Sequence, residues 1–134
     1  MLQVRALSEA PERNSKMKLA VVGGRDFNNY SLLKNTLDYI HKHNPITMII
    51  SGGATGADEM AYRYAIDKGI TFVCQPPLEE EKKEMGFARA AKRRNLRIVI
   101  MADSVIAYPT KNSKGTWHTV SLAEKLNKRV TVID

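Results

Sequence analysis

The chain has 134 residues, of which 43% are hydrophobic and 26% charged, and its formal net charge at pH 7 is +7. This length suits one domain with a single core, and the composition is that of an ordinary globular protein. No apolar run approaches the roughly 18 residues of a transmembrane helix, and the lone cysteine excludes an internal disulfide or a multi-cysteine zinc site. We therefore expect a cytoplasmic protein without a metal site or membrane contact, whose charge favours a negatively charged partner.

Residues 1–16 mix Ser8, Pro11 and Asn14 with charged side chains and have no sustained hydrophobic period. The basic start and the continuous apolar stretch of a secretory signal are both missing. We expect a flexible N-terminal extension over residues 1–16 and a folded domain over residues 17–134.

From Met17 onward, short apolar runs typical of buried strands alternate with longer segments of helical spacing. The predicted strands cover residues 19–22, 46–50, 70–74, 104–108 and 129–133. The predicted helices cover residues 32–43, 56–68, 79–102 with a candidate break near Gly86, and 116–126. Strict alternation requires right-handed crossovers. The predicted fold class is therefore α/β: a single Rossmann-like, doubly wound parallel sheet of about five strands with helices on both faces.

Ligands of such a sheet bind at the carboxyl ends of its strands, near the switch in strand order. The loop after the second predicted strand is rich in glycine and precedes a helix, so it allows a close backbone approach and offers N–H groups to a phosphate. Asp58 in this loop is a candidate acceptor for a ribose hydroxyl. The alternative is that the glycines only make a tight turn and that Asp58 offsets the helix dipole. The candidate phosphate ligands here are Ser51, Gly52, Gly53, Thr55, Gly56 and Asp58.

The spacing of these glycines matches neither the Walker P-loop nor the dinucleotide fingerprint G-x-G-x-x-G. Ordinary ATPase and dehydrogenase functions lose support accordingly.

The loop after the first strand contains Gly23, Gly24, Arg25 and Asp26. An arginine there can hold a phosphate or carboxylate through two hydrogen bonds, with Asp26 orienting it. The alternative is a solvated ion pair between the two side chains. Phe27 is expected to pack in the core.

Residues 82–97 carry seven lysines and arginines against one glutamate. Arg89, Arg93 and Arg97 form one helical stripe, which is a solvated face, a means of attracting an anionic small molecule, or a contact with nucleic-acid phosphates. Arg94 and Asn95 fall off that stripe, toward the sheet, and are the candidate ligand pair.

Gly115 and Thr116, at the start of the last predicted helix, are candidates for a second phosphate or ribose contact. Trp117 is expected to be buried, with base stacking as the alternative, and Cys74 is expected to be a small buried residue. His118, Asp58 and Asp26 are the weak candidates for acid or base catalysis, and no catalytic triad can be assembled.

Four motifs together resemble the SLOG superfamily, which includes DNA-processing protein A and the "lonely guy" phosphoribohydrolases, and specifically its YspA-like branch. They are residues 23–27, residues 51–58, Arg94-Asn95, and Gly115-Thr116 after Ala107-Tyr108. The resemblance implies a nucleotide-derived ligand between the two glycine loops and a homo-oligomer. Phosphoribohydrolases of the superfamily carry a glutamate where this chain has Thr119, and the branch usually has glycine where this chain has Ala91.

Three functions follow in order of preference. The first is the binding of a nucleotide or nucleotide-derived phosphorylated ligand, for sensing or sequestration. The second is a nucleotide hydrolase of the phosphoribohydrolase type, which the absence of the glutamate weakens. The third is single-stranded nucleic-acid binding of the DNA-processing protein A type.

Overall fold

The computed structural model describes residues 4–8 and 16–134. Six strands and five helices are present in these residues. They are β1 (Val4–Ser8), β2 (Met17–Gly23), α1 (Tyr30–His43), β3 (Ile46–Ser51), α2 (Ala57–Lys68), β4 (Thr71–Cys74), α3 (Glu79–Met85), α4 (Phe87–Met101), β5 (Ser104–Tyr108), α5 (Lys114–Lys125) and β6 (Arg129–Ile133).

One sheet contains all the described strands, in the order β1-β6-β5-β2-β3-β4. Strands β6, β5, β2, β3 and β4 are parallel, and β1 pairs antiparallel with β6. The chain builds outward from β2 in one direction through β3 and β4, and in the other through β5 and β6. The switch in strand order therefore lies between β2 and β5, where sheets of this type bind ligands.

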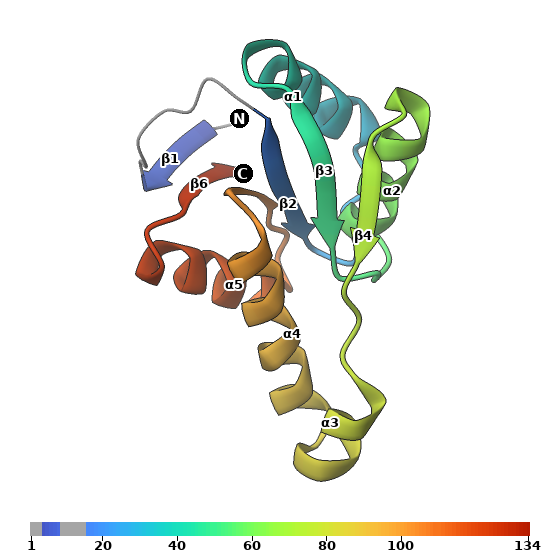
Figure 1. Cartoon of the computed structure of the whole chain (residues 1–134), viewed down its shortest axis with the longest axis vertical. Coiled ribbons are helices and arrows are strands. Elements are labelled where there is room, and N and C mark those ends of the chain that lie inside the picture. The colour runs from blue at the N-terminus through green and yellow to red at the C-terminus, as the bar shows by residue number, and fades with distance from the viewer. Residues whose placement is uncertain (1–3, 9–15) are drawn as a thin grey trace.

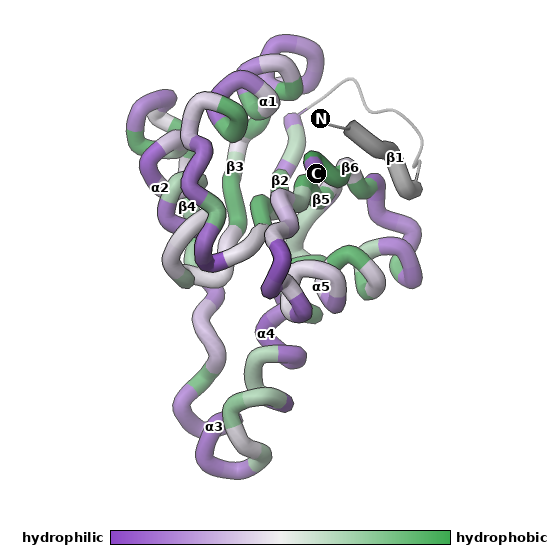
Figure 2. Tube along the Cα trace, turned by 180° about the vertical axis from the view of Figure 1, so that it is seen from behind, coloured by the Kyte–Doolittle hydropathy of each residue, from purple (hydrophilic) through white to green (hydrophobic). Residues whose placement is uncertain are grey.

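Apolar residues of β2 face both sides of the sheet, as its continuous apolar sequence predicts. Leu19 and Val21 join a buried cluster with α1 and α2 on one face, whereas Ala20 and Val22 join a second cluster with α4 and α5 on the other. The hydrophobic strands between more polar helix surfaces are visible in Figure 2. These two clusters confirm the predicted doubly wound α/β sheet with helices on both faces.

The third predicted helix is divided at Gly86, which has a φ of +85°. Short α3 and the first part of α4 extend beyond the carboxyl edge of the sheet, away from the main body (Figure 1). Arg97 Nη1 of α4 donates to both carboxylate oxygens of Glu81 in α3, at 2.9 and 3.2 Å. No side chain of α3 is buried, so this ion pair is the main polar link between the two helices.

Two expectations need correction. Val4–Ser8 form strand β1 and are not part of a flexible extension, because β6 would otherwise be the edge of the sheet and its backbone groups accept a further strand. The rest of the predicted extension, residues 1–3 and 9–15, lies outside the described residues. Cys74 is exposed, not buried, because it ends the edge strand β4. Within the described parts of the chain, no helix has both the length and the apolar character needed to cross a membrane.

Candidate functional site

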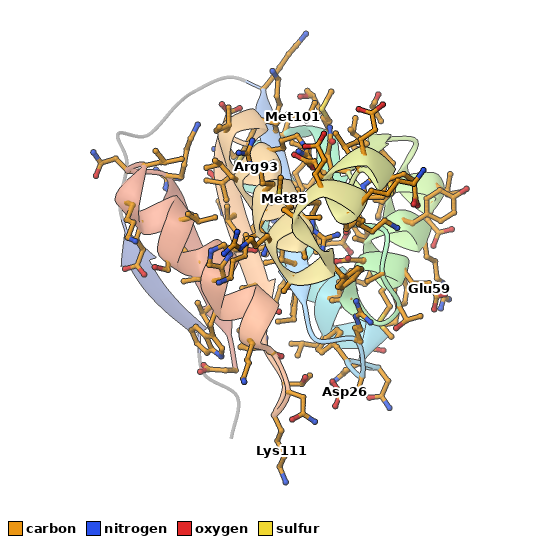
Figure 3. All side chains as sticks on the ribbon, turned by 90° about the horizontal axis from the view of Figure 1, so that it is seen from below. Asp26, Glu59, Met85, Arg93, Met101 and Lys111 are labelled. Atoms are coloured by element: carbon orange, nitrogen blue, oxygen red, sulfur yellow. The ribbon has the colours of Figure 1, made fainter. Side chains whose placement is uncertain are left out.

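A cleft of about 470 Å³ opens at the carboxyl edge of the sheet, at the switch in strand order. Its walls come from the loop after β2, the loop between β3 and α2, one face of α4, and the β5–α5 loop with the first turn of α5. In Figure 3, which looks toward this edge, Asp26 and Lys111 mark the loops after β2 and β5, and both lie to the same side of α4.

The loop after β2 packs closely against the ends of β5 and α2. The Gly24 amide donates to the Tyr108 carbonyl at 3.1 Å. A Cβ on Gly24 would lie 2.0 Å from Thr110 Oγ1, so only glycine fits between these loops. Thr110 Oγ1 donates to Asp26 Oδ1 at 2.5 Å. Asp26 is therefore turned toward the β5–α5 loop and does not line the cleft.

The amides at the start of α2 are partly used within the protein. The Ala57 amide donates to the Gly24 carbonyl at 3.3 Å, and the Ala54 amide donates to Asp58 Oδ2 at 3.0 Å. Gly56 has a φ of +73°, and a Cβ there would lie 2.4 Å from the Gly24 carbonyl oxygen. The two glycine loops are therefore held against each other by direct backbone contact.

Asp58 is nearly buried under this loop, and burial raises the pKa of its carboxyl group. Hydrogen bonds from the amides of Ala54 and Gly52 and the charge of Arg94 oppose that rise. The buried Ser51 hydroxyl also helps to lower the Asp58 pKa, although it forms no hydrogen bond of good geometry. The carboxylate thus occupies the positive end of α2.

Arg94 and Asn95 connect this loop to α5. Arg94 Nη1 donates to the Gly52 carbonyl at 3.0 Å, and its Nε donates to Asn95 Oδ1 at 2.9 Å. Burial lowers the pKa of Arg94, and the nearby charge of Asp58 opposes that shift. The Asn95 amide nitrogen contacts His118 Nδ1 at 3.2 Å and the Gly115 carbonyl at 3.5 Å.

This chain of hydrogen bonds determines the protonation of His118. Since the Arg94 Nε can only donate, its partner on Asn95 is the carbonyl oxygen, and the amide nitrogen must face His118. His118 Nδ1 is therefore the acceptor, which leaves the proton on Nε2. Burial lowers the pKa of His118, and the charges of Lys92 and Lys125 lower it further, which favours the neutral ring.

The first turn of α5 has amides that remain open. Ser113 precedes the helix, but its hydroxyl accepts from the Thr110 amide at 2.6 Å and does not cap the helix. Within the described residues, the amides of Gly115 and Thr116 have no acceptor. A Cβ on Gly115 would meet no atom within 4 Å. The free N–H groups and the helix dipole therefore make the first turn of α5 a more accessible anion site than the start of α2.

The charge of the cleft is positive. Its lining contains the cationic side chains of Arg25, Lys92, Arg94 and Lys114, and Asp58 is the one carboxylate among the lining residues. No group of three or more His, Cys, Asp or Glu side chains arranged to hold a metal is found in the part of the chain that the structure describes. The arrangement suits an anionic ligand held by amides and cations.

Most of the predicted site residues meet at this cleft, but not all of them. Those that line it are Gly23, Gly24, Arg25, Gly52, Asp58, Arg94, Asn95, Gly115 and Thr116, together with the catalytic candidate His118. Those outside the lining are Asp26, Ser51, Gly53, Thr55 and Gly56. Thr55 Oγ1 instead donates to the Arg25 carbonyl at 3.3 Å.

Several aromatic and basic residues differ from expectation. Trp117 is 41% exposed, not buried, and does not line the cleft. Phe27 packs against the Tyr108 ring with centroids 5.0 Å apart, as predicted. The basic stripe is interrupted because Arg97 binds Glu81. Arg89 and Arg93 remain exposed on α4, and Arg93 is labelled in Figure 3.

Sequence reasoning missed the contribution of α4 beyond Arg94 and Asn95. Phe87, Ala88, Ala91 and Lys92 also line the cleft, at spacings that place them on one helical face. The helix break at Gly86 could have predicted this wall, because α4 begins directly after it at Phe87.

Comparison with known proteins agrees with this architecture. Residues 17–79 match the family model of the YspA, cpYpsA-related SLOG family. Over these residues the chain is similar to that family. The match covers the glycine loops after β2 and β3 and ends before α4 and α5. No curated protein matches the sequence.

Two solved structures share the parallel α/β fold of this chain. DNA processing protein A from Streptococcus pneumoniae is 19% identical with a TM-score of 0.68, and the likeness covers 84% of this chain and 48% of that one. A structure of DNA processing protein A from Helicobacter pylori, described as having a unique single-stranded DNA binding mode, is 19% identical with a TM-score of 0.64. That likeness covers 96% of this chain and 79% of that one. This chain thus spans about half the length of the first structure, and the likeness establishes the fold alone.

Proposed function

We propose that the cleft binds a nucleotide or a nucleotide-derived phosphorylated ligand, for sensing or sequestration. The observation that carries this proposal is the combination of open amides at Gly115 and Thr116 with the surrounding cationic side chains, in one cavity at the switch in strand order. The volume, about 470 Å³, lies in the range of small-molecule sites.

In this proposal the phosphate lies at the first turn of α5. Arg25 is exposed at the cleft and adds a mobile cation, whereas Arg94 is held by Gly52 and Asn95 and adds a fixed one. Asp58 remains as an acceptor for a sugar hydroxyl. Asp58 belongs to the first turn of α2. The loop between β3 and α2 shapes the site but offers fewer amides to a phosphate, because the amides of Ala54 and Ala57 already donate within the protein.

Binding is favoured over cleavage by the environment of Thr119. This residue stands where the phosphoribohydrolases of the superfamily have a glutamate, and its hydroxyl donates to the Gly115 carbonyl at 3.0 Å. Asp58, the carboxylate of the cleft lining, accepts a hydrogen bond from the Ala54 amide and is assigned above to a sugar hydroxyl. Hydrolysis of nucleotides is therefore the weaker enzymatic alternative.

Isothermal titration calorimetry with ribose 5-phosphate, AMP and ADP-ribose tests the proposal. Gly115→Asp adds a carboxylate to open space at the anion site, and Gly115→Asn adds a neutral side chain of the same size. We expect Gly115→Asp to weaken binding on the order of 10-fold more than Gly115→Asn, because like charges at close range repel. Absence of heat with every ligand, or equal effects of the two variants, would contradict the proposal.

Single-stranded nucleic-acid binding is the second candidate. Arg89 and Arg93 are exposed on α4, and the Helicobacter pylori protein of similar fold is described as binding single-stranded DNA. If this candidate holds, the affinity for a labelled oligo-dT strand falls steeply with salt, and Arg89→Glu with Arg93→Glu removes binding. Binding that is absent at low salt would eliminate it.

We also propose a homo-oligomer, on the basis of the SLOG resemblance. Native mass spectrometry of the purified protein counts the subunits and detects a retained ligand in the same spectrum. A monomer at all concentrations would refute this part.

A further inference from the structure

One face of α4 forms a long wall of the cleft. Phe87, Ala88, Ala91, Asn95 and Ile98 all line the cavity from this helix. Ile98 is buried against the sheet and Asn95 touches the first turn of α5, whereas Phe87 begins the helix beyond the sheet edge. From Asn95 to Phe87 the helix rises about 12 Å, at 1.5 Å per residue.

The two ends of this wall differ in chemistry. The inner end carries Arg94 and Asn95 and adjoins the open amides of Gly115 and Thr116. The outer part carries Phe87, the small side chains of Ala88 and Ala91, and the cation of Lys92. A ligand that fills the cleft is therefore anionic, with a flat apolar group next to Phe87.

Phe87 has no role in the core. Its side chain is 56% exposed, and it belongs to neither of the two buried clusters. Phe87 is the first residue of α4, which begins after Gly86, and the Ala90 amide donates to the Gly86 carbonyl at 3.1 Å. Scattered exposed apolar residues are common and need no explanation, but Phe87 is one of the residues that line a charged cleft.

We infer that Phe87 is the stacking surface for the base of a nucleotide whose phosphate lies at the first turn of α5. This inference rests on the proposed function and specifies its ligand as one with a heteroaromatic base. Ala88 and Ala91 offer no hydrogen-bonding side chain to the edge of a base, so recognition at this end is by stacking. Purine and pyrimidine nucleotides both bind, with the larger purine ring binding more tightly.

The test compares AMP with ribose 5-phosphate, which lacks the base. Calorimetry of the wild-type chain should give a tighter Kd for AMP, and Phe87→Ala should raise the Kd of AMP by about 5- to 150-fold while leaving that of ribose 5-phosphate unchanged. Phe87→Tyr should retain AMP binding and Phe87→Leu should lose most of the gain. Ile100→Ala, which removes a 61% exposed side chain of α4 outside the cleft, is the matched control.

The outcomes separate the two proposals. If ribose 5-phosphate and AMP both fail to bind the wild-type chain, the proposed function is refuted, and the inference falls with it. If both bind with the same Kd, or if Phe87→Ala weakens both equally, the phosphate site stands and base stacking is refuted. If Phe87→Ala changes the subunit count in native mass spectrometry without changing AMP affinity, Phe87 is an oligomer contact and the inference is wrong.

Discussion

Replacement of Gly56 by alanine tests how the two glycine loops are joined. At this residue φ is +73° and ψ is −123°, a conformation that L residues rarely adopt, and alanine there costs about 1–3 kcal/mol in backbone strain. The new Cβ would also lie 2.4 Å from the Gly24 carbonyl oxygen and 2.5 Å from that of Arg25. Because these are backbone atoms, the loop must move, which adds about 1–3 kcal/mol.

Gly69→Ala is the matched control. Gly69 has a φ of +68° in the left-handed region at the end of α2, and a Cβ there would meet no atom within 4 Å. Only the backbone cost of about 1–2 kcal/mol applies. The expected destabilisation is therefore about 2–6 kcal/mol for Gly56→Ala and clearly less for Gly69→Ala.

Urea unfolding followed by circular dichroism measures both variants. With a slope of about 1–3 kcal/mol/M, the midpoint of Gly56→Ala should fall by at least about 0.7 M below that of the wild-type chain. Equal midpoints for the two variants would show that the loops after β2 and β3 are not in contact at Gly24, which would contradict the packing of the two glycine loops described above.

Three further predictions concern the electrostatics and the helical extension. In the wild-type chain the pKa of His118 is lowered. Asn95→Asp should raise this pKa above its usual value, because a carboxylate would then face Nδ1. NMR titration of the histidine ring protons measures the pKa, and a value that stays low would contradict the hydrogen bonds from Arg94 through Asn95 to His118. The Tyr64 hydroxyl lowers the pKa of Asp38 from 3.8 to about 2, so the ionised carboxylate stabilises the fold above pH 3.8 and this stabilisation is lost as the pH falls toward 2. Asp38→Asn should therefore make the free energy of unfolding depend less on pH in this range. A plot of urea midpoint against pH with an unchanged slope would contradict this prediction. Glu81→Gln should speed amide hydrogen exchange in α3 at least several-fold, because it weakens the ion pair with Arg97. Lys82→Ala affects only an ion pair within α3 and should leave the exchange rate unchanged. Hydrogen exchange measured by mass spectrometry compares the two variants, and equal rates would refute the role of the Arg97–Glu81 pair.

The sequence predicts the parallel sheet well because its strands are continuous apolar runs. Strand β2, for example, buries Leu19 and Ala20 on opposite faces, and no amphipathic alternative fits that pattern. Strand β1 was missed because Val4–Ser8 gain their structure from the free edge of β6, a tertiary effect that local periodicity does not carry. Exposure of Cys74 was missed for a related reason, since strand order decides which strand is the edge.

The candidate site is predictable in position but not in detail. Glycines after β2 and β3 locate the edge of the sheet, as expected from the fold. Which amides remain open depends on contacts that the pattern does not show, such as the long-range bond from Ala57 to Gly24 and the local bond from Thr110 to Ser113. The partner of His118 is likewise found only in space, because Asn95 lies on a different helix.

Chemical-shift mapping by NMR tests the central claim most directly. Titration of the labelled chain with AMP should move the amide signals of Gly115 and Thr116 most strongly, with smaller changes at Arg25 and Gly52. Signals that do not move at these amides, or that move only on the opposite edge of the sheet, would contradict the assignment of this cleft as a nucleotide site.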